Sequence, residues 1–211
     1  MKTFDLIVIG SGAGLNVAAG AAERGLKVAI VEEGSMGGTC LNRGCIPSKM
    51  VIQSAEVAEW IRRASEFGFT ASLQSVSFKF VTTRTSSTVD AESSSIRKNV
   101  HAGKNPVLFK GRGKFAGKYI VEVNGELIKG KKIVIAAGAR PSIPPIPGLD
   151  KVPYLTSTEA LRQTTLPKSM VILGGGYIGV ELGFFYAALG TKITVVQRNK
   201  LLVPREDREV A

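Results

Sequence analysis

The first 33 residues contain two short apolar runs separated by a glycine-rich turn and an alanine-rich stretch. The first run, residues 4–9, is rich in Ile and Val and stops at Gly10, which predicts a strand buried on both faces. Residues 16–24 have helix-forming composition, and residues 27–31 again have strand character before two acidic residues. Strand, glycine turn, helix, strand and acid is the order of a dinucleotide-binding unit. We therefore predict an α/β fold built on a parallel sheet.

The glycines of this turn have separate expected tasks. Gly10 makes the tight turn, Gly12 lets the backbone approach a pyrophosphate, and the helix N-terminus offers unpaired N–H groups to the phosphates. Glu32 can accept hydrogen bonds from ribose hydroxyls. Leu15 stands where a third glycine is usual, with Gly14 one place earlier, so we expect slightly relaxed packing of helix on strand. The expected nucleotide-binding residues of this unit are Gly10, Gly12, Ala13, Gly14, Glu32 and Glu33.

A second unit of the same kind begins near residue 171. A strand over residues 171–173 leads into a complete G-x-G-x-x-G, then a helix over 180–189 and a strand over 192–196. Its glycines are Gly174, Gly176 and Gly179. The acid expected after the second strand is replaced by Gln197, followed by Arg198, which removes repulsion of a 2′-phosphate and supplies a partner for it. Two units predict two nucleotides.

The only two cysteines, Cys40 and Cys45, lie in the segment Gly37–Lys49, which we call the dithiol segment. Their spacing on a glycine-containing turn allows a disulfide ring that opens and closes. Pro47 then starts a helix whose N-terminal dipole favours a thiolate at Cys45. Taken alone, the spacing also allows two ordinary buried thiols. A zinc site is disfavoured because His101, the only histidine, cannot complete the ligand set.

Between the two units we expect helices, a small antiparallel meander and a linker. Residues 50–67 have helical spacing, with Trp60 as an anchor of the apolar face, and residues 93–100 predict a second helix. The Ser/Thr-rich run 82–88 before it has the composition of a linker, but its side chains could equally face solvent on a helix. We expect His101 on the surface. The meander comprises strands 107–109, 118–123 and 126–128, with a turn at Asn124-Gly125, and a further strand follows at 132–136.

The Pro-rich residues 141–150 mark a domain boundary. We therefore expect a first domain over residues 1–148 and an incomplete second nucleotide-binding domain over 149–211. A short helix is expected after the boundary, with Ser157 or Thr158 near its cap.

The formal charge of +11 raises the question of a nucleic-acid partner. The basic residues are scattered and lack an accompanying aromatic motif, so we expect phosphate-bearing cofactors and a solvated surface instead. No stretch has the length and hydropathy of a membrane span, and the N-terminus lacks a signal-peptide cleavage site. We expect a cytoplasmic protein with no membrane partner, in reducing surroundings that keep the cysteines cycling.

The glycine turn, Glu32 and the dithiol segment together resemble the N-terminal half of the flavin-dependent pyridine nucleotide-disulfide oxidoreductases, the family of lipoamide dehydrogenase, glutathione reductase and mercuric reductase. Cys-Leu-Asn-x-Gly-Cys-Ile-Pro-Ser-Lys is most similar to lipoamide dehydrogenase. The resemblance implies two Rossmann-like domains, the first binding FAD and the second a nicotinamide nucleotide. It also implies that the Ser/Thr-rich run 82–88 belongs to a long helical excursion and is not a linker. We expect NADP rather than NAD, although an arginine also follows the acid in relatives that use NAD.

The resemblance also implies roles. Hydride passes between nicotinamide and flavin, and the flavin exchanges two electrons with the Cys40–Cys45 disulfide, which exchanges with a dithiol or disulfide substrate. Cys45 is implied to face the flavin and Cys40 to attack substrate, while Lys49, with Glu181 as its partner, polarises the flavin ring. Tyr177 matches an aromatic flap over the nicotinamide pocket, although Tyr177 and Glu181 could simply be packed and solvated helix residues. The implied catalytic residues are Cys40, Cys45, Lys49 and Glu181. The further implied cofactor contacts are Gly38, Thr39, Lys49, Gly113, Ala137, Gly138, Gly174, Gly176, Tyr177, Ile178, Gly179, Glu181, Gln197 and Arg198.

Chains of this family run about twice the present length. The resemblance therefore leads us to expect a missing C-terminal interface domain, which would supply a catalytic His and Glu to the partner of a homodimer. Two interpretations stay open: part of a homodimeric lipoamide dehydrogenase-like enzyme, or a flavin-binding fragment that does not turn over alone. The substrate also stays open among dihydrolipoyl, glutathione-type and mycothiol-type disulfides and mercuric ion.

Overall fold

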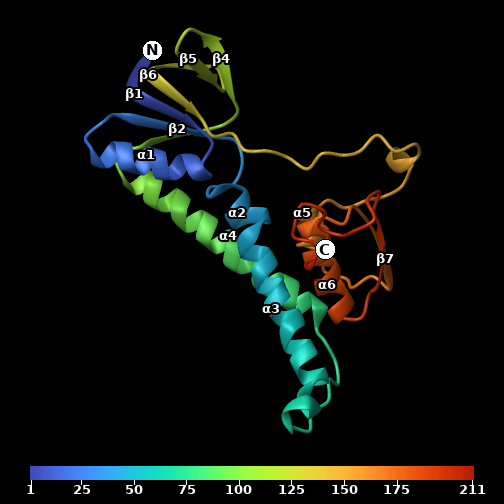
Figure 1. The fold of residues 1–211 in the computed structure, drawn as a ribbon. Coiled ribbons are helices and arrows are strands. Elements are labelled where there is room, and N and C mark those ends of the chain that lie inside the picture. Colours follow the sequence, from blue (N-terminus) through green and yellow to red (C-terminus); the bar gives the residue numbers. More distant parts are fainter. The chain divides into compact units, whose positions relative to one another are not determined.

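A computed structural model describes residues 1–211, which form two compact units (Figure 1). Unit 1 comprises residues 1–42 and 88–142, and unit 2 comprises residues 43–87 and 143–211. The long helix α4, Phe78–Ala102, contributes its first part to unit 2 and the rest to unit 1. No helix is both long and apolar enough to cross a bilayer.

Unit 1 is built on a six-stranded sheet in the order β3-β2-β1-β6-β5-β4. Four strands are parallel: β1 (Lys2–Ile9), β2 (Val28–Glu32), β3 (Val107–Lys110) and β6 (Glu126–Ile135). The other two, β4 (Gly113–Gly117) and β5 (Ile120–Val123), continue from β6 as an antiparallel meander. Ile9 pairs with both Val31 and Ile135, so β1, β2 and β6 end together at one edge. The residues that follow these three strands are therefore brought close to one another.

The two faces of this sheet have separate cores. Helix α1 (Ala13–Glu23) covers one face, where Ala18 packs on Val8 and Ile30, and Val100 near the end of α4 joins the same cluster. On the other face, β-branched and aromatic side chains of the parallel strands pack against the meander, with Phe4 and Phe109 in edge-to-face contact at 5.7 Å. Burial on both faces explains the continuous apolar runs at residues 6–9 of β1 and 28–31 of β2.

The structure confirms the α/β class and corrects several elements of the meander. The strand at 107–109 pairs in parallel with β2 and is not part of the meander. Residues 113–117 form a strand that we did not expect, and the expected strand 118–123 is shortened because Tyr119 has φ 62° in a turn. The Asn124-Gly125 turn is confirmed, with φ of 51° and 84°. The segments expected as separate strands at 126–128 and 132–136 form one strand, β6.

Helix α4 is much longer than the expected helix at 93–100. The Ser/Thr-rich run is helical, and its buried Thr82 and Thr85 hydroxyls are satisfied by donating to the carbonyls of Phe78 at 3.2 Å and Val81 at 3.0 Å. The linker interpretation of this run is therefore wrong. His101 is exposed, as expected.

Unit 2 packs helices against a two-stranded parallel sheet. Its strands are β7 (Ser169–Leu173) and β8 (Lys192–Val196), and its helices are α3 (Cys45–Arg62), α5 (Ser157–Ala160) and α6 (Tyr177–Ala188), with 3-10 turns η1 (Ala64–Phe67) and η2 (Leu149–Lys151). Val51 and Ala55 of α3 share one core with Phe185 and Tyr186 of α6 and with Phe78. Helix α3 is thus packed on the helix that follows the second glycine turn.

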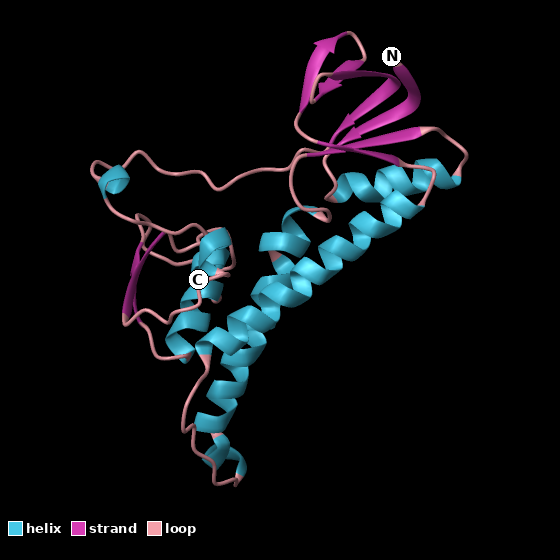
Figure 2. Cartoon of the chain, turned by 180° about the vertical axis from the view of Figure 1, so that it is seen from behind, coloured by secondary structure: helices cyan, strands magenta, loops and turns pink.

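One expectation in unit 2 is wrong and another is confirmed. Trp60 does not anchor the apolar face of α3; it is 62% exposed and contacts Phe67 at 5.6 Å between ring centroids. The expected short helix is present as α5, and Ser157 lies next to its cap, Thr156, which forms a reciprocal capping box with Glu159. The Pro-rich connector between β6 and η2 is drawn as a loop in Figure 2 and is largely exposed.

Candidate nucleotide and dithiol site

The first glycine turn has the geometry of a phosphate-binding turn. Gly10 has φ 100°, and a Cβ atom there would lie 2.1 Å from the carbonyl oxygen of Ala136, so no other residue fits. Gly12 is the N-cap of α1, which has neither a side-chain cap nor an acid in its first turn. The first N–H groups of α1 are therefore left for an anion, and the residues present fit a pyrophosphate.

Gly14 performs the close packing that we expected to be relaxed. A Cβ on Gly14 would lie 2.7 Å from Val8 Cγ1 and 2.9 Å from Ala136 Cβ. Leu15 instead packs into the core between α1 and the sheet. The expectation of loose packing is wrong, because Gly14, one position before the usual third glycine, still faces β1.

Glu32 ends β2 beside this turn, and its carboxylate is held by three donors. Oε2 accepts from the backbone N–H and the hydroxyl of Ser11, both at 2.8 Å, and Oε1 accepts from the Gly34 N–H at 2.6 Å. A fixed carboxylate next to the phosphate-binding turn suits recognition of a ribose. Ser11 was not among the expected residues.

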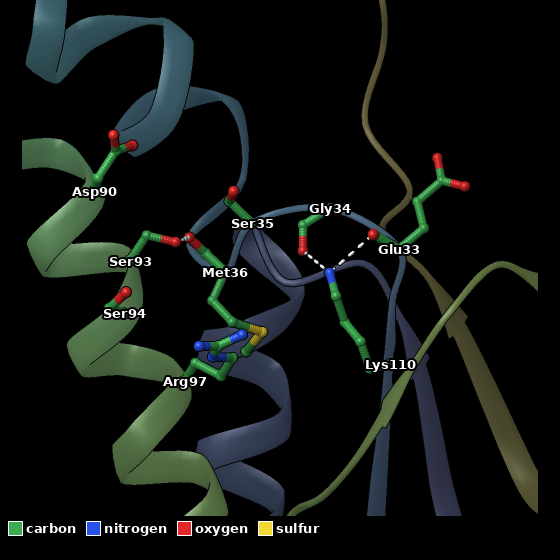
Figure 3. Close-up of a pocket in the computed structure, with 9 residues that line it drawn as sticks. All are labelled: Glu33, Gly34, Ser35, Met36, Asp90, Ser93, Ser94, Arg97 and Lys110. Carbon is green, nitrogen blue, oxygen red and sulfur yellow. Dashed lines mark hydrogen bonds between the residues drawn. The ribbon is translucent and has the colours of Figure 1, made fainter. Parts of the chain in front are cut away.

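Glu33 is directed elsewhere. Its carboxylate pairs with Arg140 at 2.6 Å, and its carbonyl accepts from the Lys110 ammonium at 2.8 Å. Figure 3 shows Glu33 and Lys110 at the rim of a pocket of about 470 Å³ between the loop after β2 and α4. Glu33 alone among the expected binding residues lines this pocket, which otherwise comprises Gly34, Ser35, Met36, Asp90, Ser93, Ser94, Arg97 and Lys110.

The dithiol segment begins in backbone contact with the nucleotide-binding turn. Gly37 and Gly38 have φ of 96° and 66°, and a Cβ on Gly38 would lie 2.4 Å from Gly12 Cα. Cys40 follows in α2 (Gly38–Arg43) and is exposed, as is Thr39. The segment that carries the cysteines therefore starts at the candidate phosphate site.

Cys45 is the first residue of α3 and is also exposed. The N-cap of this 18-residue helix is Gly44, without a side-chain cap or a first-turn acid. The positive end of the helix dipole at Cys45 favours negative charge on the sulfur. Exposure of both cysteines contradicts the interpretation as ordinary buried thiols, and no cluster of His, Cys, Asp or Glu could hold a metal ion.

Lys49, one turn further along α3, forms an ion pair with Glu181 of α6. Both side chains are accessible, at 61% and 35% exposure. The pair follows from the shared core of α3 and α6, which places the two helices side by side. The structure thus brings together two of the expected catalytic residues.

The second glycine turn repeats the geometry of the first. Gly174 has φ 104°, and a Cβ on Gly179 would lie 2.4 Å from the Gly174 carbonyl oxygen. Gly176 is the N-cap of α6, again without a side-chain cap or a first-turn acid. Tyr177 and Ile178 begin α6 with exposures of 68% and 54%, so both are accessible to a ligand.

The remaining expected residues occupy loops and strand ends. Gln197, after β8, donates to the Leu201 carbonyl at 3.4 Å, and Arg198 next to it is exposed. Gly113 packs on β2, where a Cβ would lie 3.1 Å from Val31 Cγ1. Ala137 and Gly138 are exposed after β6.

Residues 4–211 match the pyridine nucleotide-disulphide oxidoreductase family. The chain belongs to this family. Membership implies use of FAD and a nicotinamide nucleotide, in line with the two glycine turns.

Relatives with different substrates in their names are about equally similar to this chain. It is 38% identical over 209 residues to a mercuric reductase of Lysinibacillus sphaericus, covering 99% of this chain and 38% of that protein. It is 37% identical over 222 residues to a dihydrolipoyl dehydrogenase of Bacillus subtilis, covering 99% and 47%. The chain spans less than half the length of either relative.

A solved structure shares the fold over nearly the whole chain. The HOCl-induced flavoprotein disulfide reductase RclA from Escherichia coli superposes with a TM-score of 0.84 at 33% identity, covering 98% of this chain and 45% of that one. The match supports the Rossmann-like architecture of a flavoprotein disulfide reductase.

Three polar residues that hold the candidate site were not predicted from the sequence. Besides Ser11, they are Asn42, whose Nδ2 donates to the carbonyls of Met36 at 2.9 Å and Gly38 at 2.8 Å, and Ser93, whose hydroxyl donates to Met36 at 2.8 Å (Figure 3). Ser11 lies in the first glycine turn and Asn42 lies between the two cysteines. The spacing of the glycines and cysteines predicts no role for either side chain. Ser93 lies far along the chain, and no local signal points to it.

Proposed function

We propose that the protein is a flavoprotein disulfide oxidoreductase that passes electrons between NAD(P)H, FAD and a Cys40–Cys45 disulfide, and from there to or from a dithiol or disulfide substrate. The observation that carries the proposal is the backbone contact of Gly38 with Gly12, which starts the dithiol segment at the phosphate-binding turn. A segment with two exposed cysteines fits disulfide exchange better than a structural role.

We propose that residues 1–148 form the FAD-binding domain and residues 149–211 part of the NAD(P)-binding domain. In the first domain the backbone of Gly10, Gly12 and Ala13 would hold the pyrophosphate and Glu32 a ribose, with Gly14 fixing α1 on the sheet. FAD, when bound, would carry two electrons between the nicotinamide and the disulfide. We assign further backbone contacts to Gly38, Thr39, Gly113, Ala137 and Gly138.

The two cysteines have different proposed roles. Cys45, at the positive end of α3, would face the flavin as a thiolate, and Cys40 would exchange with the substrate. Lys49 would place its ammonium at the flavin ring, and Glu181 would orient that ammonium through the observed ion pair. Glu181 belongs to the helix of the second glycine turn, so this pair would also link the nicotinamide site to the dithiol helix.

For the second nucleotide we propose NADP over NAD. Gln197 removes the carboxylate that would repel a 2′-phosphate, and the exposed Arg198 can pair with it. Gly174, Gly176 and Gly179 would hold its pyrophosphate at the N-terminus of α6. We propose Tyr177 as the side chain that covers the nicotinamide, with Ile178 beside it.

The whole protein is proposed as a cytoplasmic homodimer most like a dihydrolipoyl dehydrogenase. The Cys-Leu-Asn-Arg-Gly-Cys-Ile-Pro-Ser-Lys sequence supports this substrate class. Relatives named mercuric reductase and mycothione reductase make mercuric ion and a mycothiol disulfide the competing substrates.

A steady-state assay of the purified protein separates these alternatives. Dihydrolipoamide with NAD⁺ or NADP⁺, and glutathione, mycothiol disulfide and mercuric ion with NADH or NADPH, would be compared by kcat/KM. We expect the largest value with dihydrolipoamide and a preference for the phosphorylated nucleotide. A large preference for NADH would contradict the NADP proposal, and bound FAD without turnover of any substrate would favour a flavin-binding unit that is inactive alone.

A further inference from the structure

Ser11 lies between the two glycines of the first turn and is fully buried. We propose that Ser11 is a positioning residue whose hydroxyl holds both the Glu32 carboxylate and the start of the dithiol segment, so that the flavin-nucleotide site and the dithiol segment are ordered together. The inference rests on the proposed function for the identity of the nucleotide, whereas the contacts themselves belong to the protein alone.

The direction of each hydrogen bond at Ser11 is fixed by its partners. The Gly37 N–H can only donate, so the hydroxyl oxygen accepts it at 3.2 Å. The Glu32 carboxylate acts as an acceptor, so the hydroxyl proton points to Oε2 at 2.8 Å. The same oxygen of Glu32 accepts from the Ser11 N–H at 2.8 Å. One buried hydroxyl thus forms a chain from the Gly37 amide to the acid at the end of β2.

The start of the segment that Ser11 holds is also fixed by the buried Met36 side chain, by polar contacts and by close glycine packing. The Met36 carbonyl accepts from Asn42 and Ser93, and Gly38 lies against Gly12. Figure 3 shows the Ser93 hydroxyl pointing at the Met36 carbonyl from α4. Among these contacts, Ser11 is the residue that also binds Glu32, so it is the direct connection between the ribose-binding acid and the dithiol segment.

The hydroxyl can be tested with two variants of equal shape. Ser11→Thr keeps the hydroxyl and Ser11→Val replaces it with a methyl group, so any cost of the added bulk in this buried position is common to both. Because hydrogen bonds to charged groups are the stronger ones, we expect FAD to bind about tenfold more weakly to the Val variant than to the Thr variant. Fluorescence quenching on titration of the apoprotein with FAD measures both constants, and circular dichroism confirms folding. If the bulk unfolds both variants, Ser11→Ala against the wild type makes the same comparison.

A double-mutant cycle separates positioning from general destabilisation. If Ser11 acts through Glu32, the ratio of FAD dissociation constants between the Val and Thr variants falls to about one when Glu32→Ala is also present. A ratio that stays near ten in the Glu32→Ala background would overturn the proposal. Ser35→Ala, an exposed serine in the loop after β2, is the matched control and should leave the FAD constant unchanged.

Hydrogen exchange at the Gly37 amide tests the second contact without any cofactor. In the Val variant this amide loses its acceptor, so we expect its exchange to be at least about tenfold faster than in the Thr variant. Equal exchange rates would overturn the proposed hold on the dithiol segment. If the wild type binds no FAD, the proposed function fails, and the exchange rates still decide whether Ser11 holds the segment.

Discussion

At the scale of single residues, the site depends on positions where no side chain fits. Gly12 and Gly38 approach so closely that a Cβ on Gly38 would lie 2.4 Å from Gly12 Cα. Gly38 also has φ 66°, which costs any other residue additional free energy. The contact between the first glycine turn and the dithiol segment therefore requires glycine at position 38, whereas a Cβ on Gly12 would lie 3.5 Å from Gly38 Cα.

Substituting Gly38 and a second glycine by Ala separates the free-energy cost of the positive φ from the cost of the steric overlap. Gly68→Ala is the control because Gly68 has φ 80° but no atom within 4 Å of a Cβ. We expect the control to lower the free energy of unfolding by about 1 kcal/mol through backbone conformation alone. Gly38→Ala should cost about 2 kcal/mol more, through overpacking, and also weaken FAD binding. Urea unfolding and FAD titration measure both, and equal unfolding costs would contradict the close contact.

The Lys49–Glu181 ion pair is accessible to solvent, and this accessibility distinguishes a functional role from a stabilising one. Ion pairs this accessible contribute about 0–1 kcal/mol to stability, so a structural role alone would be small. We expect Glu181→Gln to change the free energy of unfolding by less than about 1 kcal/mol while slowing flavin reduction by NAD(P)H about tenfold or more. Stopped-flow absorbance at the flavin band measures the rate. Glu59→Gln, which removes a surface pair with Arg62, should leave the rate unchanged. An unchanged rate in Glu181→Gln would reject the proposed role.

At the scale of elements, the short helix α5 is stabilised by hydrogen bonds at both its N-terminus and its C-terminus. Thr156 caps it, and the buried Tyr186 hydroxyl donates to the Ala160 carbonyl at 2.7 Å. Burial raises the pKa of Tyr186 to about 12, so the hydroxyl remains a donor at neutral pH. The cap therefore supports a helix packed on α6, which carries the second glycine turn.

The capping box gives a pH dependence with a definite sign. Hydrogen bonds from the Thr156 side chain and backbone hold the pKa of Glu159 below its usual 4.5. A depressed carboxyl pKa stabilises the folded state above pH 4.5, and that contribution is lost as the pH falls through the folded-state pKa. The difference in unfolding free energy between wild type and Glu159→Gln should therefore shrink as the pH is lowered from 7 to 3.

The same helix offers a test of the cap itself. Thr156→Ala should cost about 1 kcal/mol, whereas Ser157→Ala, at the position next to the cap, should cost little. Urea unfolding of the variants across this pH range measures all of these differences. A constant difference for Glu159→Gln, or a larger cost for Ser157→Ala, would contradict the assigned cap.

Elements with a strong local signal were predicted from the sequence, and those that depend on distant partners were not. The strand at 192–196 has the expected bounds, and both glycine turns lie where the motifs placed them. Strand β6 was divided in two because Gly130 resembles a break. In the fold, a Cβ on Gly130 would lie 3.0 Å from Ile7 Cγ1, so this glycine serves close packing on β1. Helix α4 was shortened because buried threonines in a polar run cannot be distinguished from solvated ones by composition.

At the scale of the whole molecule, two glycine turns and one dithiol segment are the features on which the proposed electron transfer depends. Helix α3 begins with Cys45 and shares a core with α6, while the start of the dithiol segment contacts the first turn. The core shared by α3 and α6 lies in unit 2, and the contact of the dithiol segment with the first glycine turn lies in unit 1. The roles of Cys40 and Cys45 were implied by family resemblance, and the exposure of both thiols is what the structure adds.

The assignment of Cys45 to the flavin side is tested most directly by the absorption spectrum of the FAD-loaded protein after anaerobic reduction by two electrons. A thiolate beside the flavin produces a long-wavelength band, which we expect in the wild type and in Cys40→Ser. Cys45→Ser should lack the band while still binding FAD. A band of unchanged intensity in Cys45→Ser would contradict the account.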